Sequence, residues 1–340
     1  MARSEFVVAL VLIVALGVVS TLAWSARPRP TDQARTSPPA VVPSPAQPSD
    51  NPPQAAQPAP SPTPTSWPLV VSQADLPNSL NPGTCVEYAP TGSARHQVVF
   101  LDAGHGGLDP GTVGTNSSGT AIKEETASLA VELSALPLLR AAGYGVVVSR
   151  TVDTSVAKLV ASDYTYGSLT AHAVRLDALA RAACANAAQA EVLVAIHFNA
   201  DSNAAYGGVM TIYDDARSFT PENLRLATLV QTELADTYRS AGLEIADLGT
   251  VPDSLSGTPA LTARGAAYGH LIELGPHSSG WVDHPSAMPG ILVEALHVTR
   301  PAEADFASGA EGQALIASAL VAAIEKFLDS GTQPTSLGAA

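Results

Sequence analysis

Short apolar segments alternate with longer stretches of helical spacing from about residue 76 onward, and this alternation constrains the fold more than any other feature. It is typical of α/β domains, in which buried strands lie between layers of helices. The short segments are rich in valine and isoleucine. They predict strands at 98–101, 146–149, 192–197, 209–213, 270–274 and 291–295.

The longer stretches predict helices at 125–142, 172–188, 222–241 and 311–328. Pro137 lies inside the first of them and should kink that helix or end it early, because proline lacks the N–H that a helix interior needs. The sequence therefore predicts a single α/β domain with a mostly six-stranded sheet and helices on both faces.

The first 75 residues have a different character. An apolar run at 6–24 follows a basic residue near the start, which is typical of a signal peptide or of one membrane-spanning helix. Residues 1–26 are predicted to be one or the other, and either implies an extracytoplasmic protein, secreted or anchored to the outer face of the membrane. Residues 27–75 are dominated by Pro, Ala, Ser and Thr, which predicts a disordered tether. The folded domain is placed at 76–330, with a flexible tail at 331–340.

Composition excludes some functions. The net charge is −14 and the pI is about 4.8, and no basic stripe is present, so a nucleic-acid partner is not expected. Cys85 and Cys184 are too few and too widely spaced for a cysteine-based zinc site. In an exported chain they are expected to form one disulfide, and two separate buried thiols are the alternative.

Three polar features lie where predicted strands end or helices begin, which is where functional groups gather in α/β sheets. His105 lies in a glycine-rich turn after the first strand, Glu124 opens the first helix, and His197 ends the third strand. Two histidines and one carboxylate are a common ligand set of catalytic zinc, which leaves a fourth position for water.

Each feature also has a simpler interpretation. The glycine-rich turn could hold a phosphate, although it lacks the sequence of a P-loop or of a dinucleotide fingerprint. A histidine at a strand end is often structural, and Glu124 could merely interact favourably with the helix dipole. It is the joint occurrence of the three features that favours a zinc site.

Together these segments resemble the zinc-dependent N-acetylmuramoyl-L-alanine amidases, in the amidase type 3 branch of cell-wall amidases. The resemblance covers about residues 98–328 and implies a phosphorylase/hydrolase-like fold. It implies that His105, Glu124 and His197 bind Zn²⁺. The residues that carry it are Asp102-Ala103-Gly104-His105-Gly106-Gly107, Asp109-Pro110-Gly111, Glu124, Ser149-Arg150, Asp153, Arg181, Ala185-Asn186 and Ala195-Ile196-His197-Phe198-Asn199-Ala200.

Two departures from the family pattern stand out. Ala195 occupies a position where the family usually has serine. The catalytic glutamate, which the family carries in a late strand, has two candidates here, Glu273 in 270–274 and Glu294 in 291–295. The preceding proline and the distance to the final helix favour Glu294.

The resemblance implies hydrolysis of the amide between N-acetylmuramic acid and L-alanine of peptidoglycan. Zinc would lower the pKa of a bound water, and Glu294 would act as general base and then general acid. No organic cofactor is needed, and we expect a monomer that acts on peptidoglycan, with membrane anchoring through residues 6–24 as an option. The alternatives are a non-catalytic peptidoglycan-binding or regulatory module and a zinc peptidase that cuts within the stem peptide.

Four further histidines lie in or near the predicted late loops. One of them could line a substrate groove or assist proton transfer, although a surface position is the more ordinary interpretation of each. They are His270, His277, His284 and His297.

Overall fold

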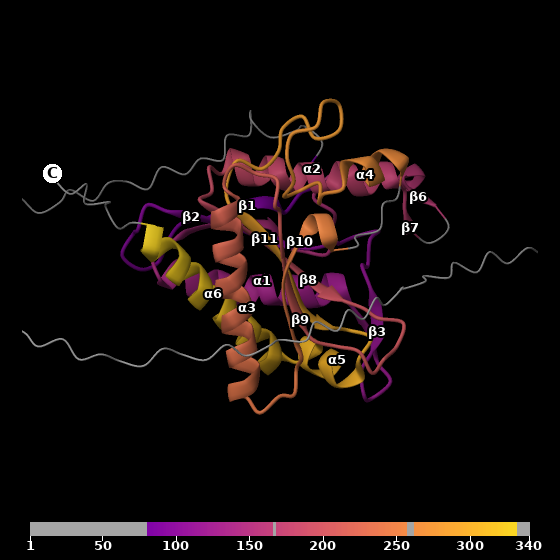
Figure 1. The fold of residues 1–340 in the computed structure, drawn as a ribbon, viewed down its shortest axis with the longest axis vertical. Helices are drawn as coiled ribbons and strands as arrows, with labels where there is room; N and C mark the ends of the chain where they lie inside the picture. Colours follow the sequence, from indigo (N-terminus) through magenta and orange to yellow (C-terminus); the bar gives the residue numbers. More distant parts are fainter. Residues whose placement is uncertain (1–79, 166–167, 257–261, 332–340) are drawn as a thin grey trace, which may run out of the picture. The chain divides into compact units, whose positions relative to one another are not determined.

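A mixed seven-stranded sheet forms the centre of the computed structural model, which describes residues 80–165, 168–256 and 262–331 (Figure 1). The strand order is β1-β5-β2-β8-β11-β9-β10. Strands β5, β2, β8 and β11 are parallel, β1 and β9 are antiparallel to the neighbours β5 and β11, and β10 is parallel to β9. The strands are β1 (Thr84–Tyr88), β2 (Val98–Ala103), β5 (Gly145–Arg150), β8 (Val192–Asn199), β9 (Val209–Tyr213), β10 (Asp247–Pro252) and β11 (Gly290–His297).

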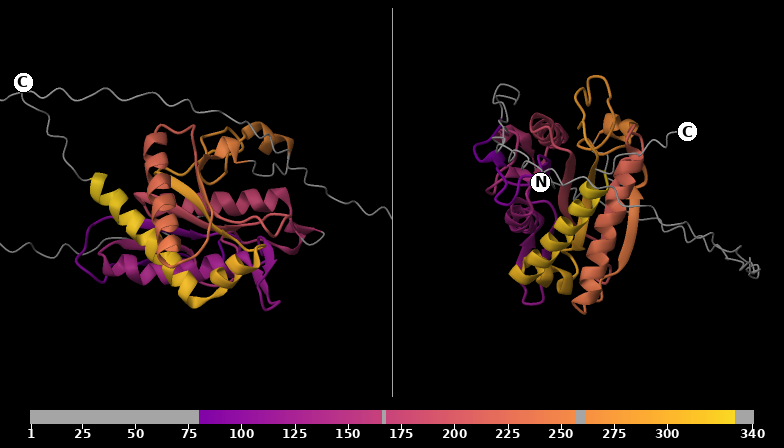
Figure 2. Two further views of the ribbon diagram at one scale, coloured as in Figure 1. Left: turned by 60° about the horizontal axis from the view of Figure 1, so that its bottom comes forward. Right: turned by 90° about the vertical axis from the view of Figure 1, so that its left-hand side faces the viewer.

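Helices cover both faces of the sheet, as predicted. One face packs against α1 (Glu124–Ala141), α3 (Thr220–Ser240), α5 (Pro301–Ser308) and α6 (Ala310–Gly331), and Figure 2 shows α3 and α6 side by side. The other face packs against α2 (Ala171–Ala187). The remaining short elements are α4 (Ala263–Tyr268), the 3₁₀ turns η1 (Ala161–Asp163) and η2 (Asp253–Leu255), and the hairpins β3 (Val113–Thr115) with β4 (Ala121–Lys123) and β6 (Tyr164–Thr165) with β7 (Ser168–Leu169).

The alternation of side chains along each strand decides which face receives the polar candidates. Successive side chains of a strand point to opposite faces of its sheet. Ala195 of β8 and Leu292 of β11 belong to the core beneath α2. His197 and Glu294 lie two residues farther along the same strands, so both side chains point toward the α2 face.

The prediction of a strand at 270–274 is wrong. This segment forms a turn, in which the N–H of Gly275 donates to the carbonyl of Leu271 at 2.7 Å and the N–H of Leu271 donates to Asp253 at 2.9 Å. Its backbone groups are thus satisfied locally and by a side chain, and not by a neighbouring strand.

The sheet has seven strands, whereas the sequence predicts mostly six. The two strands that the sequence does not predict are β1 and β10. Both lie at its edges, where residues are less buried and the apolar signal is weaker: only Cys85 of β1 is buried, and no residue of β10 is. The sequence allows helix α1 either to kink or to end early at Pro137, and in the structure the helix continues to Ala141. Leu139 of its last turn is fully buried, and this burial favours the extra turn.

A disulfide joins Cys85 of β1 to Cys184 of α2, which confirms the predicted bridge over two separate thiols. The two Cα atoms are 5.7 Å apart, and the cysteines are 99 residues apart in the sequence. The bond therefore ties an edge strand to the helix that covers the α2 face.

Replacing both cysteines by serine is expected to lower the free energy of unfolding by up to about 4.7 kcal/mol, the value that the chain-entropy model gives for a loop of roughly 100 residues. Denaturant titration of the two proteins measures the difference. Thiol titration of the denatured, non-reduced native protein should find no free thiol, and two free thiols would contradict the prediction.

Among the described residues, no single helix has the length and apolar character needed to cross a membrane, and only α5 and α6 together, bent by 80°, pass on length and composition. The predicted signal peptide or anchor (1–26) and the flexible tail apart from Gly331 lie outside the described residues, as does the predicted linker (27–75).

Candidate metal centre

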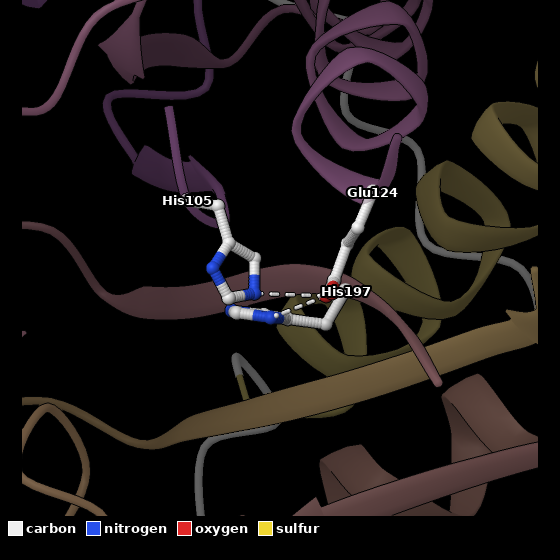
Figure 3. A group of neighbouring side chains, drawn as sticks. All are labelled: His105, Glu124 and His197. Atoms are coloured by element: carbon white, nitrogen blue, oxygen red, sulfur yellow. Dashed lines mark hydrogen bonds and ion pairs between the residues drawn. The ribbon is translucent and has the colours of Figure 1, made fainter. Parts of the chain in front are cut away.

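The structure brings His105, Glu124 and His197 together at the carboxyl ends of β2 and β8 (Figure 3). His105 follows β2, Glu124 is the first residue of α1, and His197 lies near the end of β8. Oε1 of Glu124 is 3.0 Å from Nε2 of His105 and 2.9 Å from Nδ1 of His197. Three donor atoms from separate elements thus converge on one point, and all lie within 4.8 Å of one another.

Neighbouring groups fix the orientation of these side chains. Nδ1 of His105 is 2.8 Å from Oδ2 of Asp109, which leaves Nε2 of His105 directed at the cluster. The backbone N–H of Thr112 donates to Oε2 of Glu124 at 2.8 Å, and that of Phe198 donates to Oε1 at 3.0 Å. A carboxylate behind a histidine is the usual outer support of a metal ligand.

The backbone of the glycine-rich turn is shaped to fit the cluster. His105 has φ of 62°, a left-handed conformation that costs a residue with a Cβ of order 1–3 kcal/mol and persists only where its surroundings enforce it. A Cβ at Gly104 would lie 2.3 Å from the His197 ring, and one at Gly111 would lie 2.6 Å from Oε2 of Glu124. Both glycines therefore provide the space that the three side chains occupy.

Two buried arginines hold this turn from beneath. Arg181 donates to the carbonyl of Ala103 at 2.8 Å and to that of His105 at 2.7 Å, and Arg150 donates to the carbonyl of Gly104 at 3.0 Å. Arg181 is itself paired with Asp102 at 2.6 Å. The motif residues Arg150 and Arg181 thus position the backbone that presents His105.

Glu294 lies beside the cluster. It pairs in register with His197 across β11 and β8, and its Oε2 is buried with no hydrogen-bond partner among the described residues. Burial and the negative charge of Glu124 raise the pKa of Glu294 to about 8, against the opposing charge of His105. A carboxyl group with a pKa near neutrality can both accept and return a proton.

Glu273 lies in a different environment. It is 8% exposed, and its electrostatic neighbours are Asp102, Arg181 and Asp177. Burial and the carboxylate of Asp102 raise the pKa of Glu273 well above its ordinary value, although Arg181 opposes them. Glu273 therefore belongs with the charged groups beneath the turn, whereas Glu294 faces the cluster.

The charges within the cluster favour an ionised carboxylate. Burial alone would lower the pKa of His105, but Glu124 and Asp109 outweigh it and raise this pKa to about 10. Burial would raise the pKa of Glu124, but His105 and His197 lower it. A metal ion bound by His105 would have to displace a proton from its ring, which makes binding dependent on pH.

One cavity of about 950 Å³ opens onto the cluster. His105, Glu124, His197 and Glu294 line one part of it, and residues of α2 and of 253–254, 262–266 and 268–274 line much of the rest. The cavity is large enough for a peptide or a sugar and not merely for a water molecule.

A family model for the N-acetylmuramoyl-L-alanine amidases, Amidase_3, matches residues 99–326. The chain belongs to this amidase family. The matched range contains His105, Glu124, His197 and Glu294.

Individual relatives of this amidase are distant. Protein YqiI of Bacillus subtilis, itself uncharacterised, is 27% identical over 252 residues, which are 73% of this chain and 94% of that protein. The germination-specific N-acetylmuramoyl-L-alanine amidase of the same organism is 24% identical over 239 residues, 70% of this chain and 83% of that protein. The crystal structure of an N-acetylmuramoyl-L-alanine amidase from Clostridium difficile 630 superposes with a TM-score of 0.48 and a sequence identity of 27%. The match covers 69% of this chain and 97% of that chain.

Some acidic residues in and beside the cavity are not singled out by the sequence. Asp109 was part of a motif without a role, and its spacing of four residues from His105 was the available signal. Asp214 and Asp253 belong to no recognised motif, although Asp214 directly follows a correctly predicted strand. Asp253 follows β10, which was not predicted, so its position at a strand end could not be recognised.

Proposed function

We propose that this amidase is zinc-dependent and hydrolyses the amide between the lactyl group of N-acetylmuramic acid and L-alanine of peptidoglycan. The observation that carries the proposal is the convergence of His105, Glu124 and His197 beside Glu294 in one cavity of a chain of this family. Peptidoglycan as substrate implies an extracytoplasmic site of action. Anchoring through residues 6–24, the linker at 27–75 and a monomeric state remain part of the proposal.

The donor set suits zinc. Two imidazole nitrogens and one carboxylate oxygen are ligands that Zn²⁺ takes in catalytic sites, and the support of His105 by Asp109 matches the outer support of such ligands. Zinc bound by these residues would polarise the amide carbonyl and lower the pKa of a water molecule to about 7.

Glu294 is proposed to carry the proton. Its carboxylate would accept a proton from the attacking water and deliver it to the amide nitrogen, because an amine leaves poorly unless it is protonated. Glu294 lines the cavity, and no described residue hydrogen-bonds to its Oε2, which supports this role. Arg150 and Arg181 are positioning residues, which act through the backbone around His105.

Digestion of purified sacculi with the full chain, followed by mass spectrometry of the products, tests the reaction. The expected products are sugar strands without peptides and intact stem peptides that begin with L-alanine. A zinc peptidase would instead release shorter peptides and leave L-alanine on the sugar. A binding or regulatory module would bind sacculi and release nothing, and either result would contradict the proposed function.

A further inference from the structure

A second cluster of potential ligands lies in the part of the cavity away from His105. Asp214 follows β9, Asp253 opens η2 after β10, and His270 follows α4. Because β9 and β10 are adjacent and parallel, their carboxyl ends bring the two aspartates together. Asp253 and His270 line the same cavity as the metal centre described above, so solutes can reach the cluster.

The three side chains converge on one point. Nδ1 of His270 is 3.0 Å from Oδ2 of Asp214 and 3.0 Å from Oδ1 of Asp253. The second oxygen of each aspartate is held by the backbone: the N–H of Ala216 donates to Asp214 at 2.8 Å, and that of Leu271 donates to Asp253 at 2.9 Å. Each carboxylate therefore keeps one oxygen anchored and directs the other at the cluster.

The hydrogen bonds within the described residues do not satisfy this cluster. Nδ1 of His270 carries at most one proton, which cannot fully serve two carboxylate oxygens. Although Nδ1 of His270 lies 3.0 Å away, Oδ2 of Asp214 accepts no hydrogen bond of good geometry from any described residue, and Asp214 is fully buried at 0% exposure. A hydrogen bond between Asp214 and Asp253 would require one of the two to be protonated. A buried carboxylate oxygen without a donor is costly and calls for a cation or a proton.

Among the described residues, no lysine or arginine forms an ion pair with Asp214 or Asp253. Arg217 interacts electrostatically with Asp214, but its guanidinium donates to the carbonyls of Leu274, Gly275 and Ser286. Asp215 adds a further carboxylate oxygen at 4.0 Å from Nδ1 of His270. The cluster therefore combines three acidic groups with one histidine.

The arrangement parallels that of the metal centre. There, one carboxylate oxygen lies about equally far from two histidine nitrogens, and here one histidine nitrogen lies equally far from two carboxylate oxygens. In both clusters neighbouring backbone N–H groups orient the carboxylates, as expected around metal ligands.

We propose that Asp214, Asp253 and His270 form a second divalent-cation site. Two carboxylates and one imidazole suit Mn²⁺ or Zn²⁺, with Asp215 near enough to contribute through water. Such an ion would fasten residues 253–254 and 268–274, which line the cavity, to the end of β9. The site would shape the groove and is distinct from the centre that holds His105.

Equilibrium dialysis of the chelator-stripped full chain against Zn²⁺, and separately against Mn²⁺, with elemental analysis tests the site. The unmodified chain is expected to bind two equivalents of Zn²⁺, and the His105→Ala/His197→Ala chain is expected to keep one. Adding Asp214→Asn to that double variant should remove the remaining ion. Adding Asp236→Asn, a matched change on the exposed surface of α3, should not.

The outcomes separate this inference from the proposed function. If the unmodified chain binds one equivalent of Zn²⁺ and His105→Ala/His197→Ala binds none, the second site is overturned. A proton then bridges Asp214 and Asp253, and the proposed function is unaffected. One equivalent that survives this double change but is lost with Asp214→Asn overturns the proposed metal centre alone. No bound ion overturns both.

A second readout covers the case in which Asp214→Asn does not fold. Zn²⁺ should raise the melting temperature of the His105→Ala/His197→Ala chain, because an ion that binds only the folded state stabilises it. The rise should vanish when His270→Gln is added. A rise that persists with His270→Gln would overturn the assignment of this ligand set.

Discussion

Replacing Glu294 by glutamine is expected to lower the rate of amide hydrolysis by about 10²–10⁴-fold, the usual contribution of a general base, while the bound zinc is retained. Glutamine has nearly the shape of glutamate but cannot accept a proton at neutral pH. Glu294 faces the cluster without being one of its three converging donors, so the metal centre should keep its geometry. Turnover on soluble muropeptides and elemental analysis of the same preparation measure the two effects.

Glu273→Gln is the matched control. Burial raises the pKa of Glu273 well above its ordinary value, so a neutral amide replaces a carboxyl group that favours its neutral form. Most of the activity should therefore remain. The reverse pattern, with Glu273→Gln inactive and Glu294→Gln active, would show that the proton carrier has been assigned to the wrong strand, and it would leave the three proposed ligands unaffected.

Replacing His105 or His197 by alanine is expected to remove one equivalent of zinc and to reduce hydrolysis to background. In the part of the chain that the structure describes, three side chains converge there, and none can be spared from a site that must leave a position open for water. The loss of zinc affinity should exceed the roughly 10–100-fold that follows from removing an outer supporting group. Elemental analysis and the sacculus digestion described above measure both losses.

Asp109→Ala provides the graded comparison. Asp109 contacts Nδ1 of His105 and not the centre of the cluster, so its removal should weaken zinc binding by about 10–100-fold without abolishing it. Excess zinc should then restore much of the activity of Asp109→Ala but not that of His105→Ala. If the unmodified chain binds no divalent metal, the proposed metal centre is refuted.

The sequence by itself determined the fold class. All four predicted helices are present, as α1, α2, α3 and α6, and so are five of the six predicted strands. Central strands and the helices that cover them bury apolar side chains at fixed spacings along the sequence, so a single sequence is enough to predict them. His105, Glu124 and His197 could be named because strand ends and helix starts are where α/β sheets place functional groups.

Only the tertiary structure decided what depends on neighbours distant in sequence. The run at 270–274 is apolar enough for a strand, but its backbone is satisfied by a turn and by Asp253. The sequence favours Glu294 over Glu273 only through the preceding proline and the distance to the final helix, whereas the packing places Glu294 beside the cluster and Glu273 beside Asp102. Asp214 and His270 likewise meet only because two parallel strands and a distant turn come together. The spacing of residues within one segment cannot predict such a contact.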